Sequence, residues 1–417
     1  MSIPLPQPII MPMGDASPTI ARVLRGDLCS GCGLCVGIAS DALYLETVDP
    51  GYTRPFALGP LTAADEAVVE AACPGVRVEP WPEAAYSHPV WGPYIQCLAG
   101  HATDENLRHR ASSGGALSAL LCHSLISGMV DRVLHVEADP VYPTRNRMRW
   151  SLTRDEVVSG AGSRYAASSP LADIDKALTL GGRFAFVGKP CDVSALRRLA
   201  AVDPRVEAHV PVMMSFYCAG LPSHGGADRI LARMGIAPAD VSKFRYRGFG
   251  WPGLTRVETH DGRVKEMRYE DSWGGELSRE VQFRCKICPD AVGGVADIAC
   301  ADAWYGDEKG YPQFDEQGGR SLIMSRTSVG DLLLRSAMAA GSIAAEPLPI
   351  ADIDLMQPGQ ARRKRLVAAR IAACKLAFQP IPKTAGLKVG TAAKMASVSE
   401  TLKNFVGTFR RIAQGRR

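Results

Sequence analysis

Three cysteines near the amino terminus have the spacing of iron–sulfur ligands. Cys29, Cys32 and Cys35 are separated by two residues each, and the next cysteine, Cys73, is followed by Pro74. Closely spaced thiolates with a final Cys-Pro pair are typical of a ferredoxin-type [4Fe–4S] loop. The 37 residues between Cys35 and Cys73 are tolerable, because loop closure costs only logarithmically more with length. We expect these four cysteines to bind one cluster. Zinc, whose ligands usually come as two separated pairs, is the alternative.

A second group of cysteines is expected at the edge of a β-sheet. Cys191 and Cys218 each come just after a buried, strand-like run that leads through a turn into a helix. Ligands of open α/β sheets bind at the carboxyl ends of strands, and neighbouring strands about 4.8 Å apart would bring both thiols to one cluster. Cys285 and Cys288, a CxxC pair, would complete four ligands. The alternative is that Cys191 and Cys218 are small buried core residues.

Between these groups lies a possible anion cradle. The run Ser112, Ser113, Gly114, Gly115 precedes an amphipathic stretch with helical spacing and then a β-branched run, RVLHV. Small residues at a helix start leave backbone N–H groups free for an anion, and the helix dipole adds to the attraction. This pattern predicts a phosphate site for a nucleotide or flavin, although ordinary helix capping would use the same residues.

Aromatic and cationic residues near the second cysteine group suggest further contacts. The stretch FRYRGFGWPG places Tyr246, Phe249 and Trp251 among arginines and glycines, which suits either a ring-stacking wall beside a flat ligand or a β-hairpin with core aromatics. Four cations lie close in sequence to the cysteines and could balance an anionic cluster, bind a flavin phosphate or form surface salt bridges. They are Lys189, Arg245, Arg247 and Lys286.

The composition is that of a globular protein with room for two or three domains. The 417 residues are 46% hydrophobic and 22% charged, which is ordinary for soluble chains. We find no apolar run of eighteen residues and no basic region before the first apolar stretch, so we expect a cytoplasmic protein. Twelve cysteines in such a chain indicate metal or redox chemistry rather than disulfides.

The charge is unevenly distributed along the chain. Residues 361–417 hold fourteen Lys or Arg and one acid, Glu400, and therefore carry +13, whereas residues 1–360 carry −8. A basic segment can contact an acidic protein, a membrane surface or nucleic acid. We expect a solvated, partly helical extension that could make the protein peripheral at a membrane, and nucleic acid is the least favoured partner.

The motifs, taken together and in order, resemble the coenzyme F-420 hydrogenase/dehydrogenase beta-subunit family. That family also includes the plant 7-hydroxymethyl chlorophyll a reductase and a ferredoxin-dependent divinyl chlorophyllide reductase. The resemblance covers roughly residues 22–345. It is carried by CSGCGLC, SSGGALSALL, GSRY, GKPCDVSALR, FYCAGLPS, FRYRGFGWPG, RCKICPD and ADIACADAW.

The resemblance implies an iron–sulfur flavoprotein that contains FAD. The flavin would lie near the loop 112–115 and near Ser163 and Tyr165, with Lys189 close by. The inner [4Fe–4S] cluster would be held by Cys191, Cys218, Cys285 and Cys288, and the amino-terminal run with Cys73 would match the ferredoxin-like cluster that many members add. The long gap before Cys73 and the basic segment beyond residue 362 depart from the family pattern.

The expected fold is α/β, α+β overall: a ferredoxin-like iron–sulfur segment followed by a flavin-binding core with a mainly parallel sheet. The expected divisions are a flexible arm over 1–21, a ferredoxin-like domain over 22–80, an FAD-binding domain over 81–210, a C-terminal beta-subunit domain over 211–350 and a basic tail over 351–417.

The expected activity is oxidoreduction. Clusters pass single electrons and flavin exchanges two, so the protein would relay electrons from a ferredoxin, or another one-electron donor, to a small organic substrate. The alternative is an electron-transfer subunit that docks on a partner hydrogenase or dehydrogenase and reduces coenzyme F-420. A third interpretation is a zinc- or cluster-sensing protein that binds nucleic acid.

Overall fold

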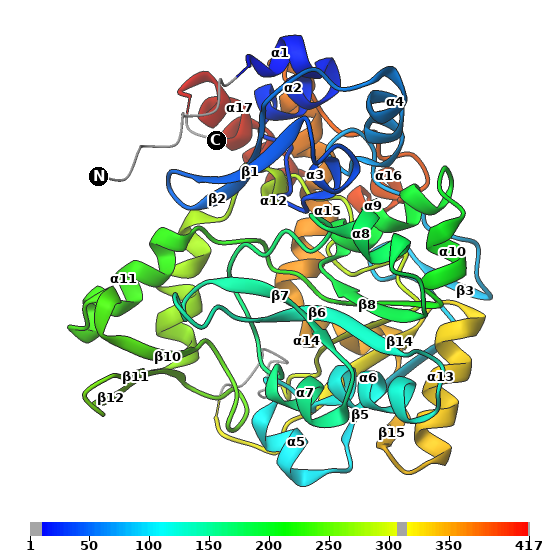
Figure 1. Ribbon diagram of the computed structural model, residues 1–417, viewed down its shortest axis with the longest axis vertical. Coiled ribbons are helices and arrows are strands. Elements are labelled where there is room, and N and C mark those ends of the chain that lie inside the picture. The colour runs from blue at the N-terminus through cyan, green and yellow to red at the C-terminus, as the bar shows by residue number, and fades with distance from the viewer. Residues whose placement is uncertain (1–10, 307–314, 416–417) are drawn as a thin grey trace, which may run out of the picture.

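A mixed eight-stranded sheet forms the centre of the computed structural model, which describes residues 11–306 and 315–415 (Figure 1). The strand order is β15-β5-β14-β13-β9-β8-β6-β7. The strands are β5 (Gln96–Ala102), β6 (Arg132–Ala138), β7 (Asn146–Ser151), β8 (Phe184–Gly188), β9 (Val212–Phe216), β13 (Ile298–Asp302), β14 (Ser321–Ser325) and β15 (Ile343–Pro347).

Only the centre of this sheet is parallel. Strands β6, β8, β9 and β13 pair in parallel, whereas β7 on one side and β14, β5 and β15 on the other pair antiparallel. The prediction of a mainly parallel sheet is therefore wrong for the described sheet as a whole. The physical reason is plain for β6 and β7, because their connection over 139–145 is too short for a parallel crossover.

Helices cover both faces of the sheet. Alternate residues of β8 point to opposite sides, with Phe184 and Phe186 in one apolar cluster and Ala185 and Val187 in the other. The first cluster includes α8 (Ile174–Thr179) and α9 (Pro190–Ala200), and the second includes α6 (Ala116–Ile126) and α13 (Ser328–Ala339). Strands covered on both faces have continuous apolar runs, which is why β8 is recognisable in the sequence.

A smaller sheet lies beside the core between β9 and β13 in sequence. It has the order β10-β11-β12 and is antiparallel, and it packs with α11 at one edge of the molecule (Figure 1). Its elements are α11 (His224–Met234), η1 (Pro238–Asp240), β10 (Val241–Arg245), β11 (Thr255–Thr259), β12 (Val264–Met267), η2 (Glu270–Gly274) and η3 (Leu277–Glu280).

The amino-terminal part is a small helical layer with a hairpin. It contains α1 (Met13–Ala16), α2 (Pro18–Arg25), α3 (Leu34–Ile38), β1 (Leu43–Val48), β2 (Tyr52–Ala57) and α4 (Ala63–Ala72). The flexible arm expected over 1–21 is wrong from residue 13 onward, because Ala16 and Ile20 are buried under this layer. Residues 1–10 of that arm lie outside the described residues. The likeness of this layer to a ferredoxin stays a prediction.

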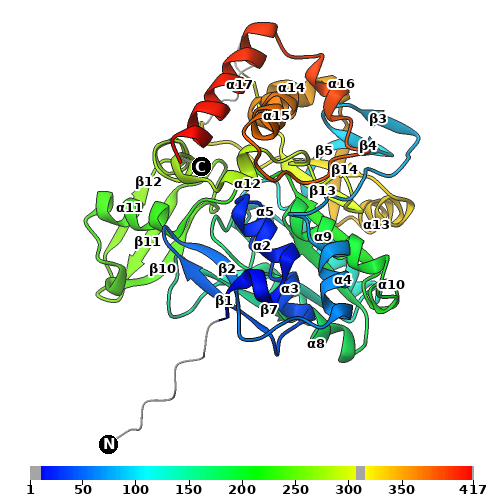
Figure 2. The same cartoon turned by 90° about the horizontal axis from the view of Figure 1, so that it is seen from above.

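The carboxyl-terminal part is packed against the body. It contains β15, η4 (Ile350–Asp352), α14 (Ile353–Met356), α15 (Pro358–Leu376), α16 (Val389–Ala393) and α17 (Val398–Ala413), and Figure 2 shows α17 at the periphery outside α15. The solvated extension expected over 351–417 is wrong for α15, where Leu366, Val367 and Cys374 are buried. Across the described residues, the helices do not combine the length and apolar content needed to cross a membrane.

Cations of α15 bind backbone carbonyls of the body. Lys364 is buried, and its Nζ donates to the carbonyls of Pro289 and Leu387, both at 2.6 Å. Arg370 donates to the carbonyl of Lys286 at 2.7 Å. Burial lowers the pKa of Lys364 to about 8. Much of the basic charge of this segment therefore serves the fold.

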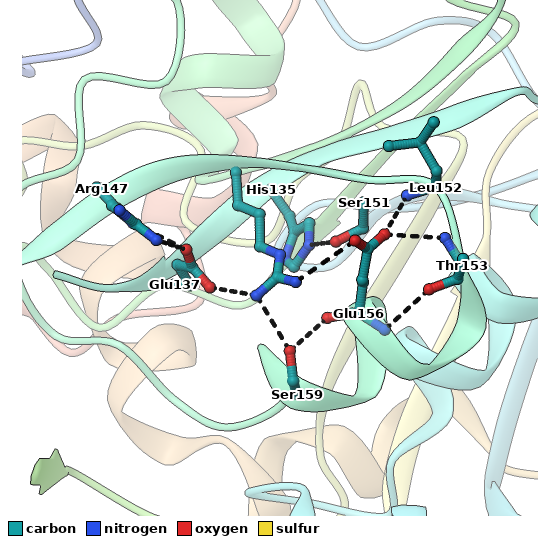
Figure 3. Close-up of polar contacts among 9 residues, drawn as sticks. His135, Glu137, Arg147, Ser151, Leu152, Thr153, Glu156 and Ser159 are labelled. Carbon is teal, nitrogen blue, oxygen red and sulfur yellow. Dashed lines mark hydrogen bonds and ion pairs between the residues drawn. The ribbon is translucent and has the colours of Figure 1, made fainter. Parts of the chain in front are cut away.

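The pair β6–β7 carries a polar network beside the core (Figure 3). His135 is buried and its Nε2 lies 2.7 Å from Ser151 Oγ. Thr153 caps α7 (Arg154–Ser159) in a capping box with Glu156, while Glu137 pairs with Arg147 at 2.7 Å. Burial, followed by the positive charge of Arg149, lowers the pKa of His135 to about 4, against opposing effects of Glu137 and Glu156.

The remaining elements connect these layers. They are β3 (Tyr86–His88) and β4 (Gly92–Tyr94), which form a hairpin, α5 (Glu105–Arg110), α10 (Arg205–His209) and α12 (Phe283–Lys286).

The packing of α15 predicts a large cost for truncating its buried face. Leu366 is 1% exposed, so Leu366→Ala should lower the free energy of unfolding by about 3 kcal/mol, the usual range for a buried leucine. Leu376, at the end of the same helix, is 58% exposed, so Leu376→Ala should cost less than about 0.5 kcal/mol. Chemical denaturation checks both, and equal small effects would restore the picture of a solvated tail.

The burial of His135 predicts a loss of stability in mild acid. Its folded pKa of about 4 lies below the ordinary 6.5, so the unfolded chain takes up the proton first as the pH falls below 6.5. Protonation of His135 in the unfolded chain should therefore lower the free energy of unfolding by up to about 3 kcal/mol at pH 4. His135→Gln should remove that part of the pH dependence in denaturation curves, whereas the same change at the exposed His260 should leave it. Parallel pH profiles for wild type and His135→Gln would contradict the expectation.

Candidate functional site

A large cavity of about 580 Å³ opens at the carboxyl ends of β8 and β9 and at the start of α6. Six of the seven residues predicted to bind flavin line it, namely Ser112, Ser113, Gly115, Ser163, Tyr165 and Lys189. Gly114 is the exception, because it packs against the sheet, where an added Cβ would lie 2.7 Å from the Gly100 carbonyl oxygen. The structure thus brings the two predicted flavin motifs to one wall.

Hydrogen bonds hold these two motifs together. The backbone N–H of Ser163 donates to Ser112 Oγ, and Ser112 Oγ donates to the carbonyl of Arg247 at 3.2 Å. Ser113 Oγ donates to the carbonyl of Arg320 at 3.0 Å. Gly115 begins α6 with φ of +77°, a left-handed conformation that favours glycine. The start of α6 is therefore turned toward the cavity, as an anion cradle requires.

The aromatic wall of the cavity differs from the one expected. The aromatic residues that line it are Tyr165, Phe216, Tyr217, Tyr269, Trp273 and Trp304. Tyr246 and Trp251 are core residues, 1% and 2% exposed, and do not line the cavity among the described residues. Trp251 instead stacks behind Trp304 with ring centroids 4.7 Å apart. The hairpin alternative with core aromatics thus fits Tyr246 and Trp251, between β10 and β11, but not Phe249, which is 47% exposed.

A buried ion pair fixes one side of the cavity. The two terminal nitrogens of Arg247 donate to the two carboxylate oxygens of Asp302 at 2.9 and 3.0 Å, and Trp251 Nε1 donates to the same carboxylate at 2.8 Å. Burial would lower the pKa of Arg247, but Asp302 raises it above its ordinary value. Its guanidinium also lies over the Tyr269 ring, 4.6 Å from the centroid, so this side presents a rigidly held ion pair to the cavity.

A second, small cavity gathers the predicted inner-cluster ligands. Cys191, Cys218, Cys285 and Cys288 all line it. As expected from their strand-end positions, Cys191 and Cys218 follow β8 and β9, and these strands are parallel neighbours. Three separate segments of the chain therefore meet at this point.

Local hydrogen bonds bring the CxxC segment to the sheet edge. The N–H of Leu221 donates to Cys285 Sγ at 3.3 Å, and the N–H of Cys218 donates to the carbonyl of Ala291 at 2.8 Å. Burial, followed by the charges of Cys285 and Cys288, raises the pKa of Cys218 to about 12. These thiols thus lie within electrostatic reach of one another.

Cations surround the inner-cluster cavity. Lys189, Arg284 and Arg363 line it, and Lys189 Nζ pairs with Asp192 at 2.7 Å. Arg363, from α15, donates to the carbonyls of Cys218, at 3.3 Å, and Ala219. Arg245 does not line the inner-cluster cavity among the described residues, and it donates instead to the carbonyls of Arg110 and Ala161.

The amino-terminal cysteines also lie close together. Burial raises the pKa of Cys35 well above its ordinary value, and the charges of Cys29, Cys32 and Cys73 raise it further. Burial and then the charge of Cys73 raise the pKa of Cys32 to about 12. Cys73 caps α4 with φ of −66° and ψ of 122°, so the Cys-Pro turn leaves the helix beside the other three.

Arg284 lies between the two cysteine groups. It lines the inner-cluster cavity and donates to the carbonyl of Pro74 at 3.1 Å. Its charge acts on both Cys73 and Cys288. It is 3% exposed, and its Nε and Nη1 have no hydrogen-bond partner among the described residues. A buried cation beside buried thiols, with two N–H groups left without a hydrogen-bond partner, is suited to binding an anionic group.

The other cysteines have separate settings. Cys97, Cys122 and Cys374 are buried in apolar clusters, as expected of packing residues, while Cys300 on β13 lines the large cavity. Across the described residues, groups of three or more His, Cys, Asp and Glu side chains positioned around a single metal ion are absent.

Sequence reasoning missed Arg284, Asp302 and the wall formed by Tyr269 and Trp304. Arg284 stands directly before Cys285 in RCKICPD, which is a local signal. Asp302 and Arg247 are 55 residues apart, so no local pattern could pair them.

Two family models match this chain, and both describe the beta subunit of coenzyme F420 hydrogenase/dehydrogenase. The model of its N-terminal part matches residues 97–174, and the model of its carboxyl-terminal part matches residues 181–350. Together these ranges include the strand ends next to both cavities and all four cysteines that line the small cavity. Residues 11–96 and 351–415 lie outside the matched ranges.

Curated relatives and solved structures are similar to this chain. A coenzyme F420 hydrogenase subunit beta from Methanococcus voltae is 28% identical over 276 residues, which is 64% of this chain and 88% of the relative. One from Methanothermobacter thermautotrophicus is 24% identical, over 70% and 99%. An F420-dependent formate dehydrogenase subunit beta from Methanocaldococcus jannaschii is 27% identical, over 53% and 57%.

A chain of the F420-reducing [NiFe] hydrogenase complex from Methanosarcina barkeri shares the fold. It superposes with a TM-score of 0.55 at 21% identity, covering 72% of this chain and 99% of that one. The match of both family models, over more than half of the sequence and in the order expected from the motifs, agrees with these relatives. The chain belongs to the coenzyme F420 hydrogenase/dehydrogenase beta-subunit family.

Proposed function

We propose that this protein is an electron-transfer oxidoreductase subunit that holds two [4Fe–4S] clusters and one FAD and exchanges electrons with a deazaflavin coenzyme of the F420 type. The observation that carries the proposal is the shared wall of the two cavities. Lys189, Cys218, Gly220, Leu221 and Arg363 line both the small cysteine cavity and the large cavity. A cluster in one and a flavin in the other would be in immediate contact.

The donor sets fit the proposed clusters. Each quartet offers four thiols, the ligand set of a [4Fe–4S] cluster, and in each quartet the negative charges disfavour one another. Binding iron removes that repulsion, because the metal takes the thiolates as ligands. Arg284 lines the inner-cluster cavity, and its Nε and Nη1 groups, which have no hydrogen-bond partner among the described residues, would donate to a negatively charged cluster or its sulfurs.

The large cavity fits a flavin in size and chemistry. Its volume of about 580 Å³ lies within the range of cofactor pockets. The start of α6 would supply backbone donors for phosphate, the ion pair of Arg247 and Asp302 fixes one side, and Tyr269 and Trp304 line the cavity with flat rings. These groups would bind and orient the cofactor.

The chemistry comes from the bound groups: clusters transfer single electrons, and flavin exchanges them for the two electrons of a hydride. The chain's own residues keep water away from the thiols, balance their charge through Lys189, Arg284 and Arg363, and fix the distance between the cavities. The names of the relatives favour F420 as the two-electron partner and another subunit as the one-electron partner. The competing hypothesis is that a ferredoxin supplies the single electrons and that a small organic substrate accepts two; we call these two molecules the competing pair.

The two quartets predict the metal content of the protein. Anaerobically purified protein should contain about eight irons and one FAD per chain. Cys218→Ser should lower the iron to about four, because it removes an inner-cluster ligand, and Cys35→Ser should do the same for the other quartet. Cys300→Ser is the matched control and should keep all the iron. About four irons in the wild type would refute one of the quartets.

The position of Ser118 predicts a separation of flavin from iron. Ser118 lies in the first turn of α6 and lines the large cavity, so Ser118→Trp should fill the flavin space. We expect this variant to lose most of its FAD absorbance and to react with reduced F420 at least about tenfold more slowly than the wild type. Its iron content should stay at about eight per chain.

The control is Ser127→Trp, at the exposed end of the same helix, which should keep both flavin and rate. If wild-type protein with full cofactors reacts with reduced ferredoxin and an organic acceptor but not with F420, the competing pair replaces the proposal.

A further inference from the structure

The outermost helix, α17, has its apolar side facing away from the protein. Val398, Leu402, Val406 and Phe409 follow one another at intervals of four, four and three residues, which places them on one face of a helix. They are 85%, 60%, 52% and 37% exposed. Met395, in the turn before the helix, is also 43% exposed. We call the four residues of the helix the α17 stripe.

The inward side of α17 combines polar contacts with the buried Ile412. Asn404 accepts from Arg370 at 2.9 Å, Glu400 pairs with Arg362 at 3.1 Å, and Thr408 is buried. These contacts fix the helix on α15, so the stripe is presented outward by the fold. Figure 2 shows α17 along the outer edge of the molecule. A folded protein rarely turns a continuous apolar stripe to water without a use for it.

The charges beside the α17 stripe are positive. Lys403 and Arg410 lie along one side of it, and among the described residues neither has an ion-pair partner. Glu400, the acid of this segment, is neutralised by Arg362. Lys394 precedes the helix, and the sequence continues with Arg416 and Arg417. An apolar stripe with an unbalanced cationic border is suited to a negatively charged surface.

We propose that α17 docks the protein onto an anionic lipid bilayer, lying in the plane of the headgroups with the α17 stripe inserted. Helices of this kind bury their apolar face at the boundary of headgroups and acyl chains and attract anionic lipids through basic residues. A second copy docked stripe to stripe would bring the same cations together. The stripe also lacks the Tyr, Trp and Arg anchors that dominate protein interfaces.

The test is sedimentation of full-length, cofactor-loaded protein with lipid vesicles. The protein should bind equimolar phosphatidylcholine and phosphatidylglycerol vesicles and bind pure phosphatidylcholine at least about tenfold more weakly. Raising the salt concentration should weaken binding, since it screens the cationic border. Equal binding to both vesicle types, or none to either, overturns the proposal.

Two pairs of variants locate the contact. Leu402→Asp should weaken binding about tenfold or more, whereas Leu332→Asp, at a 72% exposed leucine of α13, should not. Lys403→Glu should weaken binding about fivefold, whereas Lys265→Glu, at an exposed lysine of β12, should not. All four sites are exposed, so unchanged iron, flavin and unfolding midpoints should accompany each variant.

The same variants also show whether a second copy of the protein or a partner subunit, rather than a membrane, covers the α17 stripe. If Leu402→Asp leaves vesicle binding unchanged but converts a dimer into a monomer in sedimentation velocity, the stripe is a contact between copies. If Leu402→Asp abolishes instead the co-purification of a partner subunit, it is a subunit interface. Either result overturns the membrane proposal.

Discussion

Everything at this site depends on compensating buried negative charge. Eight cysteine side chains are drawn into two neighbouring groups, and in each group burial and mutual repulsion oppose ionisation. Thiolate ligands are stable there only with iron and cations near them. Arg284 meets that need for both groups at once, since its charge reaches Cys73 and Cys288. It can do so only because α12 and the turn after α4 are packed together.

The sheet provides the geometry for this arrangement. Parallel pairing of β8 with β9 aligns two strand ends, and the chain leaves each of them with a cysteine. Across the same edge, the opening of α6 and the Ser163 turn form the large cavity. The antiparallel strands at the flanks do not contribute cysteines to either quartet. The parallel centre therefore places Cys191 and Cys218 next to the large cavity, and the segment with Cys285 and Cys288 completes the small one.

Sequence reasoning succeeded where the signal was local. Cysteine spacing and strand–turn–helix units marked both quartets, and the buried run over 184–188 marked β8 because both its faces are covered. The prediction for the carboxyl-terminal segment failed, because it used the net charge of the segment and not the spacing of its apolar residues. The basic segment looked solvated, although Val367, Ile371 and Cys374 recur at helical spacing on the buried side of α15. Sequence reasoning also failed for the pair Arg247 and Asp302, which only tertiary folding brings together.

The parts of the chain outside the family models also contact the inner-cluster cavity, and they contribute Ser30 and Arg363 to its lining. Arg284, in the matched range, is held by the carbonyl of Pro74 from the amino-terminal layer, and the backbone after β9 is held by Arg363 from α15. The amino-terminal layer adds the second quartet, and the carboxyl-terminal helices add cations on one side and an outward apolar stripe on the other. Residues 97–350 thus supply the four cysteines of the inner-cluster cavity and most of the lining of the large cavity. The segments on either side add the second group of cysteines, contacts of Pro74 and Arg363 with the inner-cluster cavity, and the outward face of α17.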